Sequence, residues 1–463
     1  MTRNWKPKLG KTDQPLYLAI VQALADDISS GVLASGTRLP THRELADDLK
    51  VAIGTVTHAY TEAEKLGLVH SEGRRGTFVG ESRLGLTGSG GPFEPSSHLM
   101  DLQRFYPPFG DDPDLSVALR RLARSPSIQW MLHYVPFGGL ERHREAGAQW
   151  VERLGMKVDP DSIAITSGAH NALYLIFASL LQKGDVVVAD SHTYPGFSEI
   201  VRFLGLRPIG ISTDEDGMVP DELEAICARR KVAALYCNPT MHNPTAATMT
   251  EARRRSVAAL AEKHGFVIIE NEINRAFVPD PPPLISSIAP DRSYLVASVS
   301  KIVAAGLRAC FVACPPESVN QLNNAAHAAL YNVSPLLLEI LTLWLKDGTV
   351  DSTIRRRRAE ISRRQTLFHE IVGSRHTACT NPHGYFAWLQ LPGNWTTHRY
   401  VAEARARGVK ISPAEAFVTK GCKPANAVRV CFGANTNHDT LRQGLLTLSD
   451  ILDRPGRSGA PTI

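Results

Sequence analysis

The hydrophobic and polar positions of the first eighty residues predict three helices followed by two short strands. Apolar residues recur at helical spacing over Leu16–Ile28, and a second helix is expected to start at Thr41, where Glu44 completes a capping box. A third helix is expected over Gly54–Leu66, and Leu68–Val79 has the pattern of two strands around a basic, glycine-containing turn. Three helices and a β-wing in this order form a winged helix-turn-helix, whose third helix can enter the major groove of DNA.

After Asp101 the pattern changes to helix-like segments that alternate with short apolar runs. The runs 186–190, 266–270 and 294–297 have the length and composition of buried strands. This alternation predicts an α/β domain with a mixed, mostly parallel sheet that is covered by helices. The intervening stretch 81–100 is rich in Gly, Ser and Pro and lacks periodicity, which is typical of a flexible linker. The predicted organisation is a DNA-binding domain over 1–80, the linker over 81–100, a large domain over 101–453 and a disordered tail over 454–463.

Composition narrows the class of protein without identifying a ligand. The chain has 463 residues, 43% hydrophobic and 21% charged, which describes a soluble protein of two or more domains. No apolar run approaches the roughly 18 residues of a membrane span, and the first residues lack a signal-peptide core. The seven cysteines are scattered without a C-x-x-C pair, so no disulfide framework and no metal site is predicted, and a cytoplasmic location is expected.

Charge does not by itself indicate nucleic acid, because the net charge of +5 is small for this length. The most basic run is Arg355–Arg358, within the expected helix Ser352–Arg364. Such a run is typical of a solvated helix face, and a second nucleic-acid patch is the alternative.

The first eighty residues also carry a specific motif. The order G-x-R-L-P-T-x-R-E-L-A from Gly36, then T-V-x-x-A-Y, L-G-L-V and G-R-R-G-T-F-V, resembles the GntR family of bacterial regulators. Ala52 and Ile53 depart from this family, which often has a small polar residue followed by arginine there. Either one base contact is missing, or an apolar contact with a thymine methyl replaces it. A winged helix used for protein contact is the alternative. The resemblance implies a double-stranded DNA operator as partner and DNA contacts from Arg43, Thr41, Thr55, Thr57, Gly73 and Arg74.

A lysine follows the buried run 294–297, in the sequence Ser298-Val-Ser300-Lys301, with Arg308 further on. A lysine at the end of such a strand can condense as a Schiff base with an aldehyde cofactor, while hydroxyls and a guanidinium hold a phosphate. The segment resembles the lysine segment of fold-type I pyridoxal-phosphate (PLP) enzymes, the aspartate-aminotransferase superfamily. That resemblance implies pyridoxal 5'-phosphate as the cofactor. An ordinary surface lysine after a strand is the alternative.

Further motifs of the same superfamily follow in order. Ser167–His170 is a tight turn between a strand and a helix, where backbone N–H groups can cradle a phosphate. By resemblance, the ring of Tyr194 stacks on the pyridine, the Asn243 amide bonds the phenolic oxygen, and Arg429 grips an α-carboxylate. The resemblance assigns cofactor contacts to Lys301, Gly168, Ala169, His170, Tyr194, Asn243, Asn271, Ser298, Ser300 and Arg308, and effector contacts to Arg429 and Tyr134. No separate catalytic residue and no metal ligand is predicted.

One motif departs from the superfamily at a chemically important place. Where the superfamily normally reads E-D-D-Y, this chain has Glu270-Asn271-Glu272-Ile273. An aspartate keeps the pyridine nitrogen protonated, so that the ring can absorb carbanion charge; the neutral amide of Asn271 does this far less well. A shift by one position would bring Glu270 or Glu272 to this place, but it would turn the apolar side chains of the strand the other way. Cofactor binding is expected to survive, and efficient transamination is not.

The order of these motifs resembles the MocR/GabR-type subfamily of bacterial regulators. In that subfamily a GntR-type winged helix-turn-helix precedes a fold-type I aminotransferase-like domain with a small C-terminal α+β subdomain. The resemblance implies a domain-swapped homodimer with PLP sites between subunits. The predicted function is a PLP-dependent transcription regulator that senses an amino-group small molecule through an external aldimine at Lys301. The alternatives are an active aminotransferase fused to a DNA-binding head and a sensor of PLP itself.

Overall fold

The structure, a computed structural model, describes residues 5–7, 15–29, 33, 36–65, 68–71, 75–79, 100–108, 112–126, 128–136, 138–433 and 437–454. Contacts divide the chain into two units, residues 1–93 and 94–463. The predicted linker (81–100) and tail (454–463) fall almost entirely outside the described residues, as do Gly73 and Arg74 of the predicted wing.

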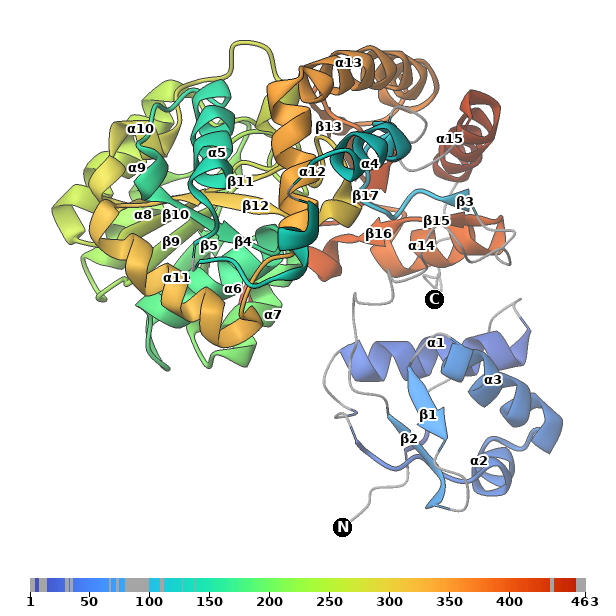
Figure 1. Ribbon diagram of the computed structural model, residues 1–463. Coiled ribbons are helices and arrows are strands. Elements are labelled where there is room, and N and C mark those ends of the chain that lie inside the picture. The colour runs from blue at the N-terminus through green and yellow to red at the C-terminus, as the bar shows by residue number, and fades with distance from the viewer. Residues whose placement is uncertain are drawn as a thin grey trace. The chain divides into compact units, whose positions relative to one another are not determined.

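The first unit has the three helices and the hairpin that the sequence predicts. Its elements are α1 (Leu16–Ser29), α2 (His42–Leu49), α3 (Ile53–Lys65), β1 (Val69–Ser71) and β2 (Thr77–Val79), shown in Figure 1. The two strands are antiparallel. The capping box is present, because the Thr41 hydroxyl accepts a hydrogen bond from the Glu44 amide and the Glu44 carboxylate accepts one from the Thr41 amide. The prediction of a winged helix-turn-helix is confirmed.

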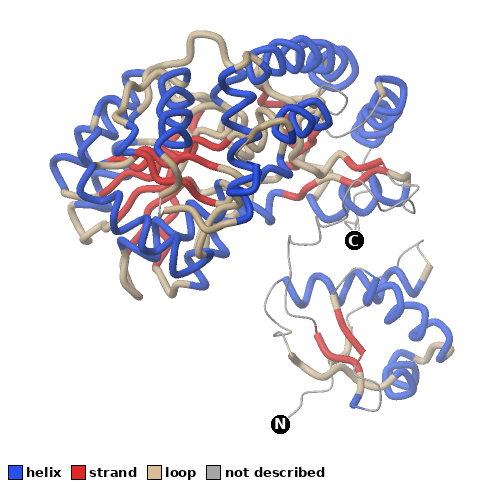
Figure 2. The backbone as a smooth tube through the Cα atoms, viewed as in Figure 1, coloured by secondary structure: helices blue, strands red, loops and turns tan. Residues whose placement is uncertain are grey.

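The second unit is built on a seven-stranded sheet. Its order is β4 (Ile163–Thr166), β12 (Cys310–Ala313), β11 (Ser293–Ser298), β10 (Val267–Asn271), β9 (Ala234–Cys237), β5 (Val186–Asp190) and β6 (Arg207–Ile211). Strand β12 is antiparallel to both neighbours, and the other neighbouring pairs are parallel. The prediction of a mixed, mostly parallel sheet is confirmed. Helices lie on both faces of the sheet (Figures 1 and 2), which is why most of its strand residues are buried.

Helices and short elements connect these strands. The helices are α4 (Leu115–Ala123), α5 (Glu141–Arg153), α6 (Ala169–Leu180), α7 (Pro195–Phe203), α8 (Pro220–Cys227), α9 (Glu251–His264), α10 (Ile285–Ile288), α11 (Pro316–Leu330) and α12 (Pro335–Lys346). The short elements include the 3-10 turns η2 (Ile128–Leu132) and η4 (Arg275–Phe277) and the hairpin β7 (Thr213–Asp214) with β8 (Gly217–Met218).

The direction of the strands decides where functional residues gather. Strands β4, β5, β9, β10 and β11 all run the same way, so their carboxyl ends lie at one edge of the sheet. Asn271 is the last residue of β10, and the segments that follow β4, β5, β9 and β11 carry Gly168, Tyr194, Asn243 and Lys301. This edge is where open α/β sheets bind ligands.

The C-terminal part forms the predicted small α+β subdomain. Its antiparallel sheet has the order β13 (Ala378–Thr380), β14 (Phe386–Gln390), β17 (Ala427–Cys431) and β16 (Ser412–Pro413). Its helices are α13 (Thr349–Phe368), α14 (Thr397–Ala406) and α15 (His438–Asp453). Strand β3 (Met100–Asp101) pairs in parallel with β15 (Val409–Lys410). The chain therefore enters the second unit attached to the small subdomain.

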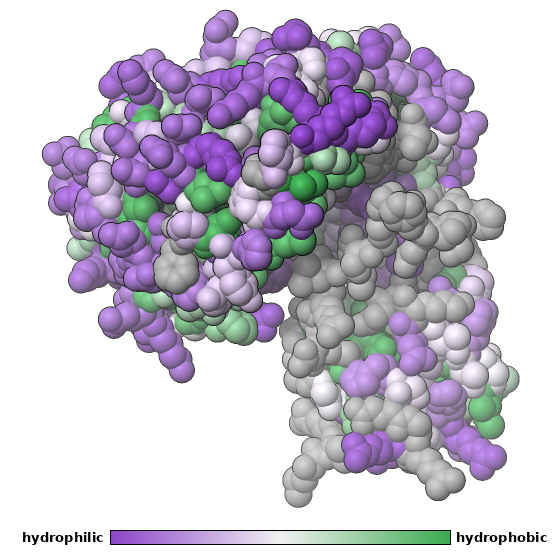
Figure 3. Space-filling view, in the orientation of Figure 1, coloured by the Kyte–Doolittle hydropathy of each residue, from purple (hydrophilic) through white to green (hydrophobic). Residues whose placement is uncertain are grey.

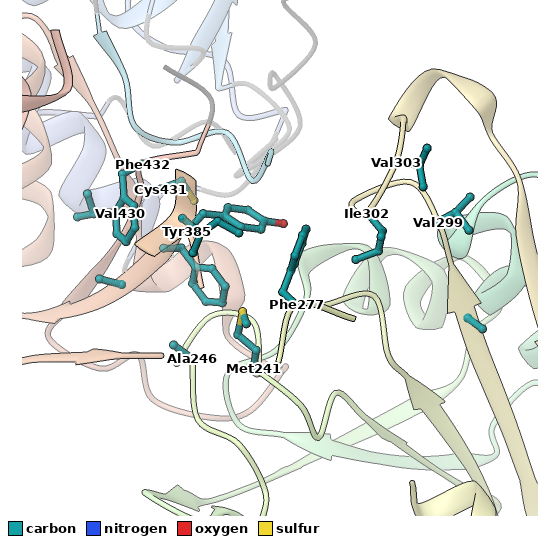
Figure 4. Packing of buried hydrophobic residues seen from close by; sticks show 14 of the residues in the cluster. Met241, Ala246, Phe277, Val299, Ile302, Val303, Tyr385, Val430, Cys431 and Phe432 are labelled. Atoms are coloured by element: carbon teal, nitrogen blue, oxygen red, sulfur yellow. The ribbon is translucent and has the colours of Figure 1, made fainter. Parts of the chain in front are cut away.

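A continuous hydrophobic core joins the small subdomain to the large one. Figure 4 shows Tyr385 from the small subdomain between Phe432 and Phe277, with Met241 below it and Ile302, from the turn after β11, beyond Phe277. The rings of Phe277 and Tyr385 meet edge to face, with centroids 6.1 Å apart and planes at 89°. Loops that carry candidate site residues are thus packed into the core from both subdomains.

The arginine run of α13 corrects one prediction. Arg357 is only 1% exposed, forms an ion pair with Asp112 and points a guanidinium nitrogen toward the carbonyl oxygen of Lys301 (3.5 Å). Arg358 donates a hydrogen bond to the carbonyl oxygen of Ala276 (2.8 Å). The prediction that this run is a solvated helix face is therefore wrong for these two residues.

Within the described parts of the chain, none of the helices has both the length and the apolar composition of a bilayer span. Over the same residues, no three His, Cys, Asp or Glu side chains are grouped so as to hold a metal ion.

Candidate cofactor and effector site

Lys301 lies in the turn after β11. Its Nζ donates a hydrogen bond to the carbonyl oxygen of Phe105 (2.7 Å) and lies 4.9 Å from the ring centroid of Tyr106. Burial, and after it the nearby guanidiniums of Arg429 and Arg308, lower the pKa of Lys301 to about 8. A primary amine with this pKa is partly neutral, and therefore nucleophilic, near neutral pH.

The turn between β4 and α6 is shaped to hold an anion. Gly168 caps α6 with φ +89°, and the first backbone N–H groups of the helix, those of Ala169 and His170, have no acceptor within it. The Arg308 guanidinium lies over Gly168, where a Cβ atom would be 2.5 Å from its Nη2, and donates to the carbonyl oxygen of Ser167 (3.1 Å). Glycine is therefore required here both by its φ and by the close guanidinium.

Two serines from the turn before Lys301 add hydroxyls. The Ser300 amide donates to the Oγ of Ser298 (3.2 Å). The Oγ of Ser300 is buried and has no hydrogen-bond partner within the described structure. A helix N-terminus, a guanidinium and an unpartnered hydroxyl together suit a phosphate group. This set of residues around Gly168 is called the phosphate end below.

Tyr194 precedes α7 and is held on two sides. Its ring covers Gly196, where a Cβ atom would lie 2.4 Å from a ring carbon, and its hydroxyl is 3.4 Å from Nδ1 of His170. Burial raises the pKa of Tyr194, so the ring stays neutral. A fixed, neutral ring of this kind can stack on an aromatic cofactor.

Asn271, the last residue of β10, has one satisfied and one unsatisfied side-chain atom. Its Nδ2 donates to the hydroxyl of Tyr236 (2.9 Å), whose ring stacks on Phe197 with centroids 4.9 Å apart. Its Oδ1 is buried without a hydrogen-bond partner among the described atoms. A buried acceptor without a donor suits a protonated ring nitrogen, although an amide supplies no negative charge to hold that proton. Asn271 and Tyr236 are called the ring-nitrogen end below.

The two carboxylates that flank Asn271 have partners of their own. Glu270 accepts hydrogen bonds from the amides of Ile285 (2.9 Å) and Ser286 (2.7 Å). Glu272 lies 3.3 Å from Arg254, and burial raises its pKa to about 7. Strand alternation thus directs both carboxylates into a buried ion-pair cluster, and neither contacts Tyr236 in place of Asn271.

Arg429 on β17 supplies the remaining cation. Its Nη1 donates to Oδ1 of Asn243 (2.6 Å) and its Nη2 donates to the carbonyl oxygen of Gln103 (3.1 Å). The guanidinium carbon lies 4.6 Å from the ring centroid of Phe417 and 5.1 Å from that of Phe105. Two residues that the sequence assigned separately, Asn243 and Arg429, are therefore in direct contact.

The segment 103–106 belongs to the site and was missed by the sequence reasoning. Its backbone carbonyls accept hydrogen bonds from both Lys301 and Arg429, and the Phe105 ring packs beside both cations. The available sequence signal was the aromatic pair Phe105-Tyr106 just after the start of the large domain. Tyr236, the partner of Asn271, was also missed.

Tyr134 is placed differently from the other assigned residues. Its side chain is 80% exposed, and the centroid of its ring lies 4.5 Å from that of Tyr331, the residue after α11. Among the described residues, the hydrogen bonds of Lys301 and Arg429 go to Phe105, Asn243 and Gln103, not to Tyr134.

In the first unit, the assigned DNA contacts that are described lie on α2, at its N-cap and on α3. Arg43 and Thr57 are exposed and Thr55 is half-buried, while the Thr41 hydroxyl is used in the capping box. The Thr57 hydroxyl donates to the carbonyl oxygen of Ile53 (3.0 Å). Ile53 itself is 48% exposed at the start of α3, where an apolar contact with a base is sterically open.

Two family models match the chain. Residues 16–79 match the gntR family of bacterial regulatory proteins, and residues 100–448 match the aminotransferases of class I and II. The two matches cover the winged helix-turn-helix and nearly all of the second unit.

Full-length relatives combine both parts. The chain is 31% identical to the HTH-type transcriptional regulator YdeF of Bacillus subtilis, over 97% of each chain. It is 28% identical to the vitamin B6 salvage pathway transcriptional repressor PtsJ of Salmonella typhimurium, over 82% of this chain and 86% of PtsJ. Among solved structures, the α-aminoadipate aminotransferase LysN of Thermus thermophilus, complexed with N-(5'-phosphopyridoxyl)-L-leucine, superposes with a TM-score of 0.70 at 22% identity. That match covers 77% of this chain and 92% of LysN, and at this identity it shows the fold alone.

Proposed function

The chain belongs to the MocR/GabR-type transcription regulators, which join a GntR-family winged helix-turn-helix to a PLP-dependent domain of the class I and II aminotransferases, and we propose that it senses an amino-group small molecule. The observation that carries the proposal is the contact set around Lys301: an amine of lowered pKa close to Arg429, which is paired with Asn243. The Lys301 amine suits an aldehyde cofactor, and the Arg429 guanidinium suits the carboxylate of an amino acid.

Pyridoxal phosphate is the cofactor of this family, and the residues present fit it. The phosphate end offers the α6 N-terminus, Arg308 and the unpartnered Ser300 hydroxyl; the ring-nitrogen end offers the unpartnered Oδ1 of Asn271. Tyr194 would stack on the ring and Asn243 would bond its phenolic oxygen. When bound, PLP supplies an aldehyde for which the Lys301 amine and the amine of a ligand compete.

The effector would be held by its carboxylate at Arg429. This guanidinium already donates to the Gln103 carbonyl, and its buried Nε has no partner in the described residues. A carboxylate that accepts both outer N–H groups would replace the Gln103 carbonyl. Because segment 103–106 also accepts the hydrogen bond of Lys301, an amino-acid ligand would loosen this segment at both of its attachments.

This segment suggests how binding is communicated. It follows β3, and the chain before β3 leads to the winged helix-turn-helix. A ligand that binds one position of segment 103–106 more tightly than another would shift the segment toward that position. The difference in affinity sets the size of the shift, which would be passed on to the chain leading to the DNA-binding unit. In that unit Arg43, Thr55, Thr57 and the exposed Ile53, with Gly73 and Arg74, would contact an operator.

A homodimer is part of the proposal. The second unit exposes two pairs of large apolar side chains. Leu132 (82%) and Tyr134 (80%) form one pair, and Leu330 (45%) and Tyr331 (50%), at the C-terminal end of α11, form the other. Figure 3 shows hydrophobic residues gathered between hydrophilic ones on the displayed face of this unit. Exposed apolar groups of this size are typical of subunit contacts. In a domain-swapped dimer Tyr134 would act in the site of the partner subunit. Sedimentation equilibrium of the wild type and of a Tyr134→Asp variant would test the dimer.

A second function is favoured by one relative. PtsJ is named as a repressor of vitamin B6 salvage, so PLP itself is the alternative signal for this chain. Under that alternative, occupation of the site by PLP would change operator affinity without an amine.

The deciding experiment measures operator affinity in three proteins. Genomic DNA fragments selected by the PLP-loaded chain are titrated with a panel of amino acids and amines, using wild type, Lys301→Ala and Arg429→Gln. We expect an amino acid to change the affinity for DNA in wild type with PLP present, and both variants to lose the response. A response to PLP alone would favour the alternative signal, and steady formation of keto acids would favour an active aminotransferase.

A further inference from the structure

A cleft separate from the cofactor site lies between the end of α5, η4 with the loop after it, and the first turns of α13. Its volume is about 310 Å³. Four of its lining residues are arginines and one is an aspartate: Arg153, Arg275, Arg355, Arg358 and Asp351. The remaining lining is mostly apolar, from Trp150, Leu154, Ala276, Val278, Pro281 and Ile354.

The cleft has an excess of positive charge. Asp351 is paired with Arg153 (3.1 Å), and Arg275 approaches Glu272 (3.9 Å), a carboxylate that it shares with Arg254. Arg355 forms no ion pair with any residue that the structure describes. Burial lowers the pKa of both Arg275 and Arg358, and the carboxylates of Glu272 and Asp280, respectively, act against this shift.

Two residues that line the cleft each have a buried hydrogen-bond donor without an acceptor in the described structure. The indole Nε1 of Trp150 is buried, in a side chain only 1% exposed, and has no partner in the described structure. The Nε of Arg358 is likewise buried and unpartnered, although its Nη2 is fixed by the Ala276 carbonyl (2.8 Å). Buried donors without acceptors are destabilising and rare, so a ligand whose acceptor oxygen reached either of them would be stabilised.

We propose that this cleft binds a small organic anion, with its oxyanion against the arginines and the Trp150 indole and its apolar part against Leu154, Val278 and Ile354. The shared chemistry is a carboxylate or phosphate ester on a compact apolar body. The cofactor and effector sites use none of these side chains.

The position of the cleft gives such binding a consequence. On one side, η4 begins three residues after Glu272, and its Arg275 pairs with Glu272. On the other side, α13 carries Arg357, which points toward the Lys301 carbonyl oxygen. An anion bridging α13 and the η4 loop would therefore restrain the two segments that flank the cofactor site.

The test uses the full-length chain loaded with PLP, so that the phosphate end is occupied. Isothermal titration with phenyl phosphate, benzoate and neutral phenol measures binding. We expect one site with a Kd of about 1 mM or tighter for at least one of the two anions, and no binding of phenol. The stronger of the two anions identifies the source as a phosphate ester or a carboxylate.

Variants locate the site. Arg355→Gln, an exposed position, should weaken binding about ten-fold, and Trp150→Phe about three-fold, because each removes a donor to the oxyanion. Arg356→Gln, the neighbour on α13 that does not line the cleft, should leave the Kd unchanged. Arg429→Gln should also keep the binding, which separates this site from the proposed effector site. Absence of binding by both anions, or binding that Arg355→Gln leaves intact or that Arg356→Gln weakens equally, would overturn the proposal.

Discussion

The phosphate end and the ring-nitrogen end of the cofactor site differ in how they are built. At the phosphate end, Gly168, the α6 N-terminus and Arg308 form a cationic cradle of the kind expected for the superfamily. At the ring-nitrogen end, the expected carboxylate is an amide, and Asn271 is bonded to Tyr236. In the proposed cofactor site, one end would therefore keep what is needed to hold PLP, and the other would lack the negative charge that stabilises a carbanion on its ring.

This difference teaches that cofactor binding and electron withdrawal are carried by separate residues. Binding depends on backbone N–H groups, a guanidinium and hydroxyls, and is insensitive to the charge of the residue at the ring nitrogen. Acceleration of transamination depends on a preorganised negative charge at the ring nitrogen. A regulator needs the first property and is better served without the second, because a ligand that is consumed cannot report its own concentration.

The largest expected effect concerns the pH at which Lys301 becomes reactive. Its pKa is lowered to about 8 by burial and by Arg429 and Arg308, so the amine becomes neutral as the pH rises through about 8. At pH 8 its neutral fraction exceeds that of an ordinary lysine about 100-fold. Reductive methylation of the cofactor-free chain, followed by peptide mass spectrometry, should give a rate for Lys301 that levels off above this pH. A rate that keeps rising to pH 10, as for an ordinary lysine, would show that the amine is not perturbed.

A substitution at the phosphate end should have the next largest effect. Arg308→Gln removes the cation over Gly168 while it leaves the ring-nitrogen end untouched. We expect the affinity for PLP to fall by roughly 10- to 100-fold, as for the loss of a charge-assisted hydrogen bond. Equilibrium dialysis measures the change. Arg255→Gln on the exposed face of α9 is the control, and equal losses in both variants would mean that Arg308 acts through overall charge.

At the ring-nitrogen end, Asn271→Asp should change chemistry more than affinity. The carboxylate would supply the negative charge that Asn271 lacks, and we expect the conversion of an amino acid to its keto acid to rise about ten-fold or more. The affinity for PLP should change by much less than in Arg308→Gln. Keto-acid formation measured by chromatography decides the matter. If turnover stays at the wild-type level in a folded, PLP-bound variant, Asn271 is not the partner of the ring nitrogen.

Local patterns predicted the elements and named most of the residues of the candidate site, because both depend on short stretches of sequence. The capping box at Thr41, the strands that end at Asn271 and before Lys301, and the turn at Gly168 are all encoded within a few residues. The strand direction then gathers these turns at one edge. The contact between Asn243 and Arg429 follows from two motifs that meet through tertiary structure.

The missed features depend on contacts between distant segments. Nothing near Phe105 signals that its carbonyl accepts from Lys301, because the partner lies almost two hundred residues away in the sequence. The arginine run of α13, in contrast, carries a local signal for one buried residue. Four consecutive helical residues span about 300° of the helix circumference, so on a helix packed against a core at least one of them must face inward. Arg357 is that residue.

The smallest expected effect belongs to a single hydroxyl of the phosphate end. The Oγ of Ser300 is buried without a partner, so Ser300→Ala removes an unsatisfied group from the cofactor-free chain and should leave its thermal stability unchanged or slightly raised. With PLP present the same hydroxyl would bond the phosphate, and its loss should weaken PLP binding about three-fold. Melting temperatures with and without PLP separate the two effects: the gain in melting temperature on adding PLP should be smaller in Ser300→Ala than in wild type. An equal gain would place the Ser300 hydroxyl outside the phosphate contacts and leave Arg308 and the α6 N-terminus to hold that end.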